Sequence, residues 1–219
     1  MAEMHDTTEE YLEHIIELEE EGVTPLRARL VERLGLSAAS VSETVGRLVD
    51  NGFVEMHDDR SLGLTGKGRT LATTVVRRHR LAERLLLDVI GLEWEKVHRE
   101  ADRWEHAISA DVEEKLVELL GDPMTCPHGN PIPGSLRKAS TVPSVALAES
   151  DTGPVTVSRI SEKLELNDES LRLLAHTRMI PGATATVLQR NKDGVTVKTS
   201  AGEHDIPAVI AEQVYVSGA

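Results

Sequence analysis

The sequence predicts a mainly α-helical protein that ends in a small β-rich domain. Three observations support this prediction. Before residue 65 the elements follow the order helix, helix, turn, helix and hairpin, which is the winged helix-turn-helix arrangement. Longer helical patterns follow as far as residue 120. After Gly153 the helical periodicity gives way to strand-like alternation.

The first predicted helix covers residues 7–22. Thr7 or Thr8 is placed to cap it, Glu10 to complete a capping box, and Gly22 to end it. One face of this helix should be buried, because its apolar residues recur at helical spacing: Tyr11, Leu12, Ile15, Ile16 and Leu18.

The next two predicted helices form the helix-turn-helix itself. Pro25 opens a helix over residues 26–34, and Gly35 ends it. Ser37 is a good N-cap for the following helix, Ala38–Asp50. This last helix is therefore the predicted recognition helix.

A short hairpin, the wing, should follow the recognition helix. Asn51 and Gly52 give a turn signal, after which Val54–Met56 can pair with residues 61–64 across residues 57–60.

Three further helices are predicted behind the wing. The first runs over residues 67–90 and stops at Gly91; the others cover residues 95–108 and 111–120, joined by Ser109. Residues 121–150 are rich in Pro, Gly and Ser and indicate loop and linker.

The C-terminal part is predicted to be a small β-rich barrel with one short helix over residues 168–175. Alternating residues mark its strands at residues 155–157, 183–187 and 195–198.

The composition limits the class of protein. A chain of 219 residues fits two or three small domains, and aromatic residues at 2% imply aliphatic cores. No apolar run reaches the roughly 18 residues of a membrane span, and the N-terminus has no apolar core of a signal peptide. The single cysteine, Cys126, excludes an intrachain disulfide and fits a reducing compartment, so we expect a cytoplasmic protein.

A net charge of −13 is unfavourable for a DNA-binding protein, because phosphate contacts need Lys and Arg. Local basic patches or bound cations would remove this objection. Winged helices also serve as protein–protein modules, in which case the arginines form an ordinary solvated face. The candidate DNA contacts are Thr7, Arg27, Arg29, Ser37, Ala38, Ala39, Ser40, Ser42, Glu43, Arg47 and Arg60.

His and carboxylate residues gather on the predicted helices. His79 and Glu83 are four residues apart and share a helix face. On the next helix, spacings of four, three and one bring four residues to one side: His98, Asp102, Glu105 and His106. The first helix adds Glu10, Glu13 and His14. Single side chains of this kind are usually solvated, but the combined set predicts a transition-metal site.

The chain resembles the diphtheria toxin repressor and iron-dependent regulator family over nearly its whole length. The resemblance is carried by DTTE at residues 6–9, EEEGVTPLRAR at 19–29, RHRLAERLL at 78–86, RWEH at 103–106 and GNPIPG at 129–134.

The resemblance implies three domains and a homodimer that binds double-stranded operator DNA under the control of metal ions, two sites per subunit. The expected boundaries are 1–72 for the winged helix-turn-helix domain, 73–140 for a helical dimerisation and metal domain, 141–152 for a linker and 153–219 for an SH3-like barrel. No catalysis, membrane or small-molecule substrate is implied. The family's ancillary metal site falls on His79, Glu83, His98, Glu162 and Glu165.

The primary metal site departs from the iron-sensing pattern. Where iron-sensing members have Met and Cys, this chain has Glu10 and Asp102, while Glu105 and His106 are retained. This resembles the manganese transport regulator branch, in which a further carboxylate corresponds to Glu13. Harder, sulfur-free ligands favour Mn(II).

Alternatives remain open. The first alternative is an Fe(II)-dependent repressor of iron uptake and siderophore genes, because Fe(II) also accepts His and carboxylate ligands. A metallohydrolase and a metal-buffering protein are others, although no nucleophile elbow, phosphate loop or HExxH motif is present. Arg80 and Asn130 match an anion-binding spot of the family, but its usual Ser is Cys126 here. His128 is interpreted as an ordinary loop histidine.

Overall fold

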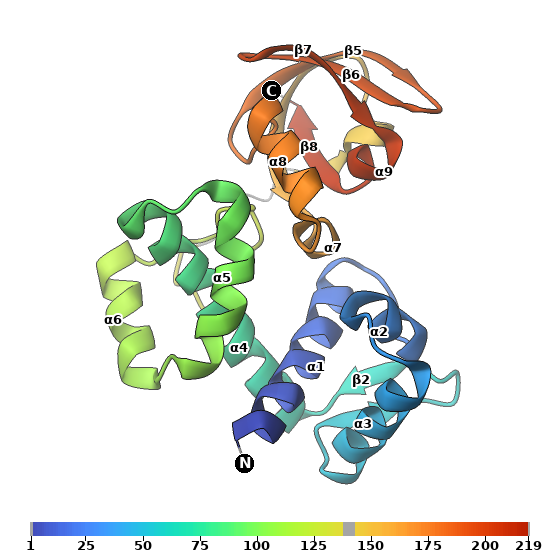
Figure 1. Cartoon of the computed structure of the whole chain (residues 1–219), viewed down its shortest axis with the longest axis vertical. Coiled ribbons are helices and arrows are strands. Elements are labelled where there is room, and N and C mark those ends of the chain that lie inside the picture. Colours follow the sequence, from blue (N-terminus) through green and yellow to red (C-terminus); the bar gives the residue numbers. More distant parts are fainter. Residues whose placement is uncertain (1, 138–142, 219) are drawn as a thin grey trace. The chain divides into compact units, whose positions relative to one another are not determined.

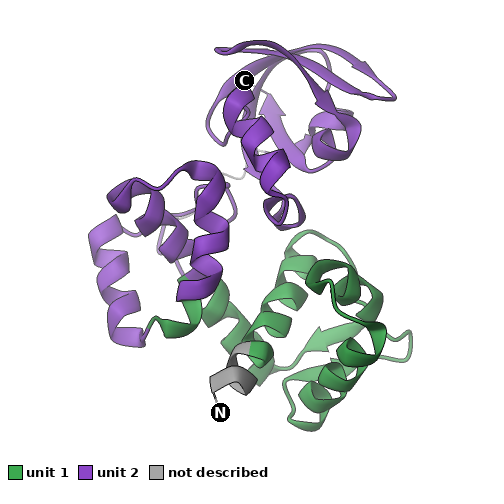
Figure 2. Cartoon of the chain, viewed as in Figure 1, with its two compact units in different colours: residues 1–78, 105–108 green, residues 79–104, 109–219 purple. Residues whose placement is uncertain are grey.

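The computed structural model describes residues 2–137 and 143–218, with side chains from Thr7 onward. The last residues of the predicted helical domain and the first two of the predicted linker therefore lie outside the described residues. The chain, whose elements are labelled in Figure 1, forms two compact units, which Figure 2 shows in different colours. Unit 1 extends to Arg78 and includes Glu105–Ile108; unit 2 contains His79–Trp104 and the chain from Ser109.

Unit 1 is a winged helix-turn-helix, as the sequence predicts. It contains α1 (Ala2–Glu20), α2 (Arg27–Leu34), α3 (Ala38–Asp50), the antiparallel hairpin of β1 (Val54–Met56) and β2 (Leu62–Leu64), and the first part of α4 (Gly66–Arg84).

Local chemistry explains the ends of α2 and α3. Gly35 follows α2 with a φ of 64°, a left-handed conformation that favours glycine. Ser37 caps α3 by accepting a hydrogen bond from the Ser40 amide at 3.2 Å. The predicted cap of α1 is wrong, because α1 begins at Ala2 and Thr7 and Thr8 lie inside it. No Pro or Gly precedes Thr7 to stop the helix from extending.

The core of unit 1 is almost wholly aliphatic and joins α1, α2, α3, the hairpin and the first part of α4. Leu12 and Ile15 of α1, Leu30 of α2, and Val41 and Val45 of α3 are fully buried in one cluster. Burial of each such side chain is worth about 1.5–3 kcal/mol. The position of α1 and that of the recognition helix α3 are therefore coupled through packing.

The helical part of unit 2 is less regular than predicted. The expected single helix over residues 67–90 changes at its end into a π-helical turn, η1 (Leu85–Ile90). The expected helix over residues 95–108 is divided into η2 (Trp94–Lys96), α5 (Val97–Trp104) and the 3-10 turn η3 (Glu105–Ala107), which belongs to unit 1. Helix α6 (Ala110–Leu120) is capped by Ser109.

The C-terminal part of unit 2 is a six-stranded antiparallel sheet in the order β3-β8-β4-β5-β6-β7. Its strands are β3 (Val145–Ala146), β4 (Gly153–Ile160), β5 (Thr184–Asn191), β6 (Gly194–Thr199), β7 (Gly202–Pro207) and β8 (Val214–Gly218). This part also contains the helix α8 (Asp168–Thr177) and three short helical turns: η4 (Leu147–Glu149), α7 (Glu162–Glu165) and α9 (Ala208–Ala211).

The sequence predicted β4, β5, β6 and α8 but not the remaining elements of this part. β7 lacks an alternating apolar pattern and pairs on one side only, with β6, and β3 and η4 lie within the predicted loop and linker over residues 121–150. Trp94 of η2 packs against the barrel core, so the helical part and the barrel form one body. No helix among the described residues is long and apolar enough to cross a membrane.

Candidate metal centre

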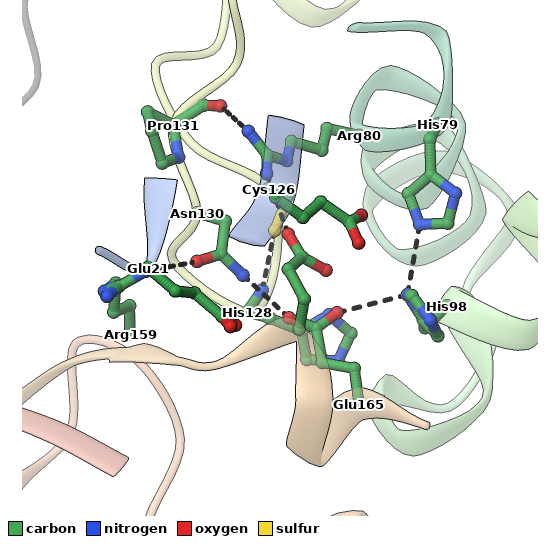
Figure 3. Close-up of polar contacts among 12 residues, drawn as sticks. Glu21, His79, Arg80, His98, Cys126, His128, Asn130, Pro131, Arg159 and Glu165 are labelled. Atoms are coloured by element: carbon green, nitrogen blue, oxygen red, sulfur yellow. Dashed lines mark hydrogen bonds and ion pairs between the residues drawn. The ribbon is translucent and has the colours of Figure 1, made fainter. Parts of the chain in front are cut away.

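The ends of α4 and α5 bring three predicted ligands together in unit 2. His79 and Glu83 are one turn apart on α4, and His98 of α5 lies beside His79 (Figure 3). His79 Nε2 lies 3.1 Å from His98 Nδ1, and both nitrogens lie within 3.7 Å of Glu83 Oε1. All three residues are buried.

The barrel supplies two carboxylates to the same place. Ser161 caps the short helix α7, which carries Glu162 and Glu165, both buried. Glu165 Oε2 lies 3.2 Å from His98 Nδ1, and the ligand atoms of His98, Glu162 and Glu165 lie within 4.8 Å of one another. The structure thus gathers all five residues of the predicted ancillary site.

His128 is the residue that sequence reasoning missed. It was predicted to be an ordinary loop histidine, yet it is fully buried. Its Nδ1 lies 2.9 Å from Glu83 Oε1 and 2.8 Å from Glu165 Oε2. The interpretation of residues 121–150 as loop concealed it, because nothing local in the sequence reports that this loop is packed.

The loop is held against strand β4. The Ile160 amide donates to the carbonyl oxygen of His128 at 2.8 Å. Gly129 has a φ of 90°, and a Cβ there would lie only 2.2 Å from the Ser158 carbonyl oxygen. Only glycine permits this approach, so the GNPIPG stretch was the available signal that the neighbouring side chains are buried.

A second layer of polar groups holds the barrel carboxylates. Arg80 donates to Glu162 Oε1 at 2.8 Å, and Asn130 Nδ2 donates to Glu165 Oε1 at 2.7 Å. These are the two residues expected to bind an anion. In this structure both contact carboxylates of the chain itself, so binding of a separate anion stays a prediction.

Burial and neighbouring charges have opposite effects on the pKa values of the residues in this centre. Burial raises the pKa of Glu83, but the charge of His128 and hydrogen bonds from the neighbouring histidines outweigh it and hold this pKa well below its usual value. Burial lowers the pKa of His98 and of His128, and the surrounding carboxylates reverse this and raise both pKa values well above normal.

This donor set fits a divalent cation. Glu83 Oε2 and His128 Nε2 are buried without a hydrogen-bond partner among the described residues, an arrangement that is costly for polar atoms. A cation among neutral imidazoles and carboxylates would satisfy such atoms and replace the protons that the cluster otherwise holds.

Asp102, predicted as a primary ligand, lies beside this centre. Its Oδ1 is 3.4 Å from His79 Nδ1 and 3.9 Å from His98 Nε2, the ring nitrogens opposite those that face Glu83. A carboxylate behind a histidine fixes the ring's orientation and tautomer. Asp102 is thus placed to orient His79, the nearer of the two histidines.

In unit 1 the other predicted primary ligands are only partly brought together. His106 Nδ1 lies 2.7 Å from Glu9 Oε2 of α1, and its Nε2 lies 3.4 Å from Glu105 Oε1. Glu13 is buried, but Glu10 is exposed. Glu9 and Glu13, four residues apart, share the buried face of α1, whereas Glu10 is rotated by about 100° from Glu9. The sequence prediction did not include Glu9.

The candidate DNA contacts in unit 1 present an exposed helix end. Ser37, Ala38, Ala39 and Ser40 at the start of α3 are exposed, so the first turn of the predicted recognition helix presents only small side chains. Arg47 contacts Glu43 at 3.1 Å one turn earlier, and Arg29 pairs with Glu32 at 2.9 Å.

The other candidate DNA contacts lie away from the start of α3. Arg27 is partly buried beside Met56, and Arg60 is exposed in the hairpin turn with a φ of 67°. Thr7 is partly buried on α1, and Ser42 is exposed on α3.

Comparison with known proteins gives a consistent result. Residues 3–62 match the iron dependent repressor N-terminal DNA binding domain, and residues 65–134 match its metal binding and dimerisation domain. The chain is 45% identical to the iron-dependent repressor IdeR of Mycobacterium tuberculosis, with 99% of each chain covered. It is 45% identical to the diphtheria toxin repressor of Corynebacterium diphtheriae, over 87% of this chain and 88% of that protein.

The solved structures that resemble this chain include a manganese-dependent repressor and an IdeR protein. A manganese-dependent transcriptional repressor in complex with manganese matches with a TM-score of 0.83 and 32% identity, covering 97% of this chain and 100% of that one. IdeR of T. acidophilum matches with a TM-score of 0.77 and 30% identity, covering 96% of this chain and 97% of that one.

Proposed function

The chain belongs to the iron-dependent repressor family of metal-dependent transcriptional repressors, and we propose that Mn(II) is the metal that activates it. It would repress genes of manganese uptake and homeostasis by binding operator DNA as a homodimer. The three-domain division at residues 1–72, 73–140 and 153–219, with a linker over 141–152, is part of this proposal.

The chemistry of the donor set carries the proposal. The predicted primary ligands are Glu10, Glu13, Asp102, Glu105 and His106, with no sulfur among them. The contact between Glu9 and His106 adds another carboxylate in unit 1. Mn(II) binds weakly compared with later divalent metals, so hard carboxylate ligands and the absence of thiolate are what can favour it.

The position of α1 suggests how the metal acts. Glu9 and Glu13 lie on α1, whereas Glu105 and His106 lie on the 105–108 segment of the same unit. A cation held between them would fix α1, whose apolar face packs in the core with α3. Metal binding would then favour the conformation in which α3 can enter the major groove.

The ancillary residues are proposed to hold a second cation. His79, Glu83 and His98 come from the helices, and Glu162 and Glu165 from the barrel. A cation there would supply positive charge that fastens the barrel to the helical part. Arg80 and Asn130 would orient the two barrel carboxylates.

Activation by Fe(II) is the second candidate, and the 45% identity to iron-dependent repressors supports it.

The test that distinguishes the two metals begins with a DNA duplex selected from a random library by the full-length protein in the presence of Mn(II). Its affinity is then measured by fluorescence anisotropy under Mn(II), Fe(II) without oxygen, Co(II) and Zn(II). We expect Mn(II) to activate at a physiological concentration and Asp102→Ala to lose activation, while the exposed control Asp151→Ala retains it. Equal affinity with and without metal would refute the mechanism, and activation by Fe(II) but not Mn(II) would favour the second candidate.

A further inference from the structure

A buried thiol lies beside the candidate metal centre and has no part in the proposed function. Cys126 is 1% exposed, and its Sγ belongs to a group of three possible metal ligands with Glu83 and His128. The three ligand atoms lie within 4.8 Å of one another, and all three residues are buried; Figure 3 shows Cys126 and His128 next to each other.

We propose that Cys126, His128 and Glu83 form a thiolate-containing binding site for Zn(II), or for Co(II) as its chemical substitute. The site shares two carboxylates with the ancillary set: Glu83, which also faces His79 and His98, and Glu165, which completes the site as a fourth ligand. Its ligands include a thiolate, whereas the proposed primary site has no sulfur ligand.

The distances between the nitrogen and oxygen donors are close to those around a cation of this size. With bonds of about 2.0–2.1 Å to nitrogen and about 2.0–2.2 Å to oxygen, donor atoms of a tetrahedral zinc site lie roughly 3.3 Å apart. His128 Nδ1 lies 2.9 Å from Glu83 Oε1 and 2.8 Å from Glu165 Oε2. A small outward movement of these atoms would admit the ion in place of the proton that they share.

One tight turn holds the thiol and the imidazole. The amide of His128 donates to Cys126 Sγ at 3.3 Å, and the amide of Gly129 donates to the Cys126 carbonyl at 3.0 Å. The Cys126 amide in turn donates to the Asn130 carbonyl at 2.8 Å. Two ligands two residues apart on a turn fixed to β4 need little reorganisation to bind an ion.

Thiolate chemistry sets the preferred metal. Cys126 would bind a metal ion as its thiolate, the form of cysteine that acts as a ligand. When the ion binds, the S–H bond breaks, the proton passes to solvent and a metal–sulfur bond forms. Soft thiolate ligands select Zn(II) over Mn(II), so manganese should compete poorly here.

Co(II) absorption tests the site directly, because a thiolate ligand produces a charge-transfer band in the near ultraviolet. Full-length protein, kept reduced with a phosphine, is titrated with Co(II). The wild type should develop this band, and Cys126→Ser should lose it while keeping the visible d–d bands of other sites. His79→Gln is the matched control, because it alters the ancillary set but not the thiolate set, and it should keep the band.

X-ray absorption at the zinc edge gives an outcome that needs no variant. Wild-type protein loaded with Zn(II) should show a sulfur neighbour at about 2.3 Å. Absence of the sulfur neighbour and of the Co(II) band would show that Cys126 is an inert buried cysteine and overturn the proposal. Mn(II)-dependent binding of the selected duplex by Cys126→Ser should be unchanged, which keeps this test separate from that of the proposed function.

Discussion

The two units use the same kinds of side chain in contrasting settings. In unit 1, His106 keeps 21% of its side chain exposed, while Glu9 and Glu105 beside it keep 6% and 3%. In unit 2, Glu83 and His128 have 1% and 0% exposure and belong to a cluster of six His and carboxylate residues. An open cluster can exchange ions with solvent as their concentration changes, whereas a closed one retains its ion and connects two parts of a fold. We therefore expect the partly open cluster around His106 to sense the metal and the closed cluster around Glu83 and His128 to use it structurally.

The largest effect should come from Glu83→Gln, which removes the carboxylate shared by the buried histidines. Breaking a buried ion pair by removing one partner costs about 3–5 kcal/mol, so unit 2 of the metal-free protein should be destabilised by about this amount. Both tryptophans, Trp94 and Trp104, belong to unit 2, so tryptophan fluorescence during urea unfolding follows that unit alone. Glu114→Gln, at an exposed position of α6, is the control; a similar midpoint shift in both variants would contradict a special role for Glu83.

The next effect should come from His106→Ala in unit 1. Loss of this ligand should remove the coupling between Mn(II) and DNA, a factor of roughly 5–150 for a typical coupling free energy. The midpoint of unit 2 should remain unchanged in the same variant. Undiminished activation of duplex binding by Mn(II) would show that the open cluster is not the sensor.

A smaller change in metal preference is expected from the double variant Glu10→Met with Asp102→Cys. It replaces two hard ligands by soft ones, so the ratio of activation by Fe(II) to activation by Mn(II) should rise about tenfold, or roughly 1.4 kcal/mol. Because Glu10 is exposed, Glu9→Met with Asp102→Cys should be measured beside it. If only the Glu9 variant changes the ranking, Glu9 rather than Glu10 is the ligand from α1; if neither does, ligand hardness does not set the preference.

The smallest expected effect is the pH dependence of unit 2 in the presence of a chelator. The pKa values of Glu83 and Glu165 are lowered by folding, so their contribution is present above about pH 4.5 and is lost as the pH falls through the folded values. Those of His98 and His128 are raised, so their contribution is present below about pH 6.5 and is lost as the pH rises through the folded values.

The metal-free unit should therefore be most stable between about pH 4.5 and 6.5. Its melting temperature should fall by about 2–4 °C for each kcal/mol lost at higher pH. Saturating Zn(II) should reverse this trend, because the ion competes with protons for the same atoms. A metal-free melting temperature that rises from pH 6 to pH 8 would contradict the assigned charges.

Short-range sequence patterns determined much of the secondary structure of this protein and which side chains share a helix face. Gly35 and the capping residue Ser37 fix the turn of the helix-turn-helix, because their effects depend on neighbouring residues only. The four-residue spacing of His79 and Glu83 likewise guarantees a shared face on any helix. Glu162 and Glu165 were predicted through family resemblance rather than through local pattern.

Tertiary structure alone decided the rest. His128 entered the cluster because Gly129 lets its loop pack on β4, a contact between distant segments that leaves no periodic signal in the sequence. The choice of Glu9 over Glu10 depended on which side of α1 faces residues 105–108. In both cases the side chain was identifiable from the sequence, but its surroundings were set by long-range packing.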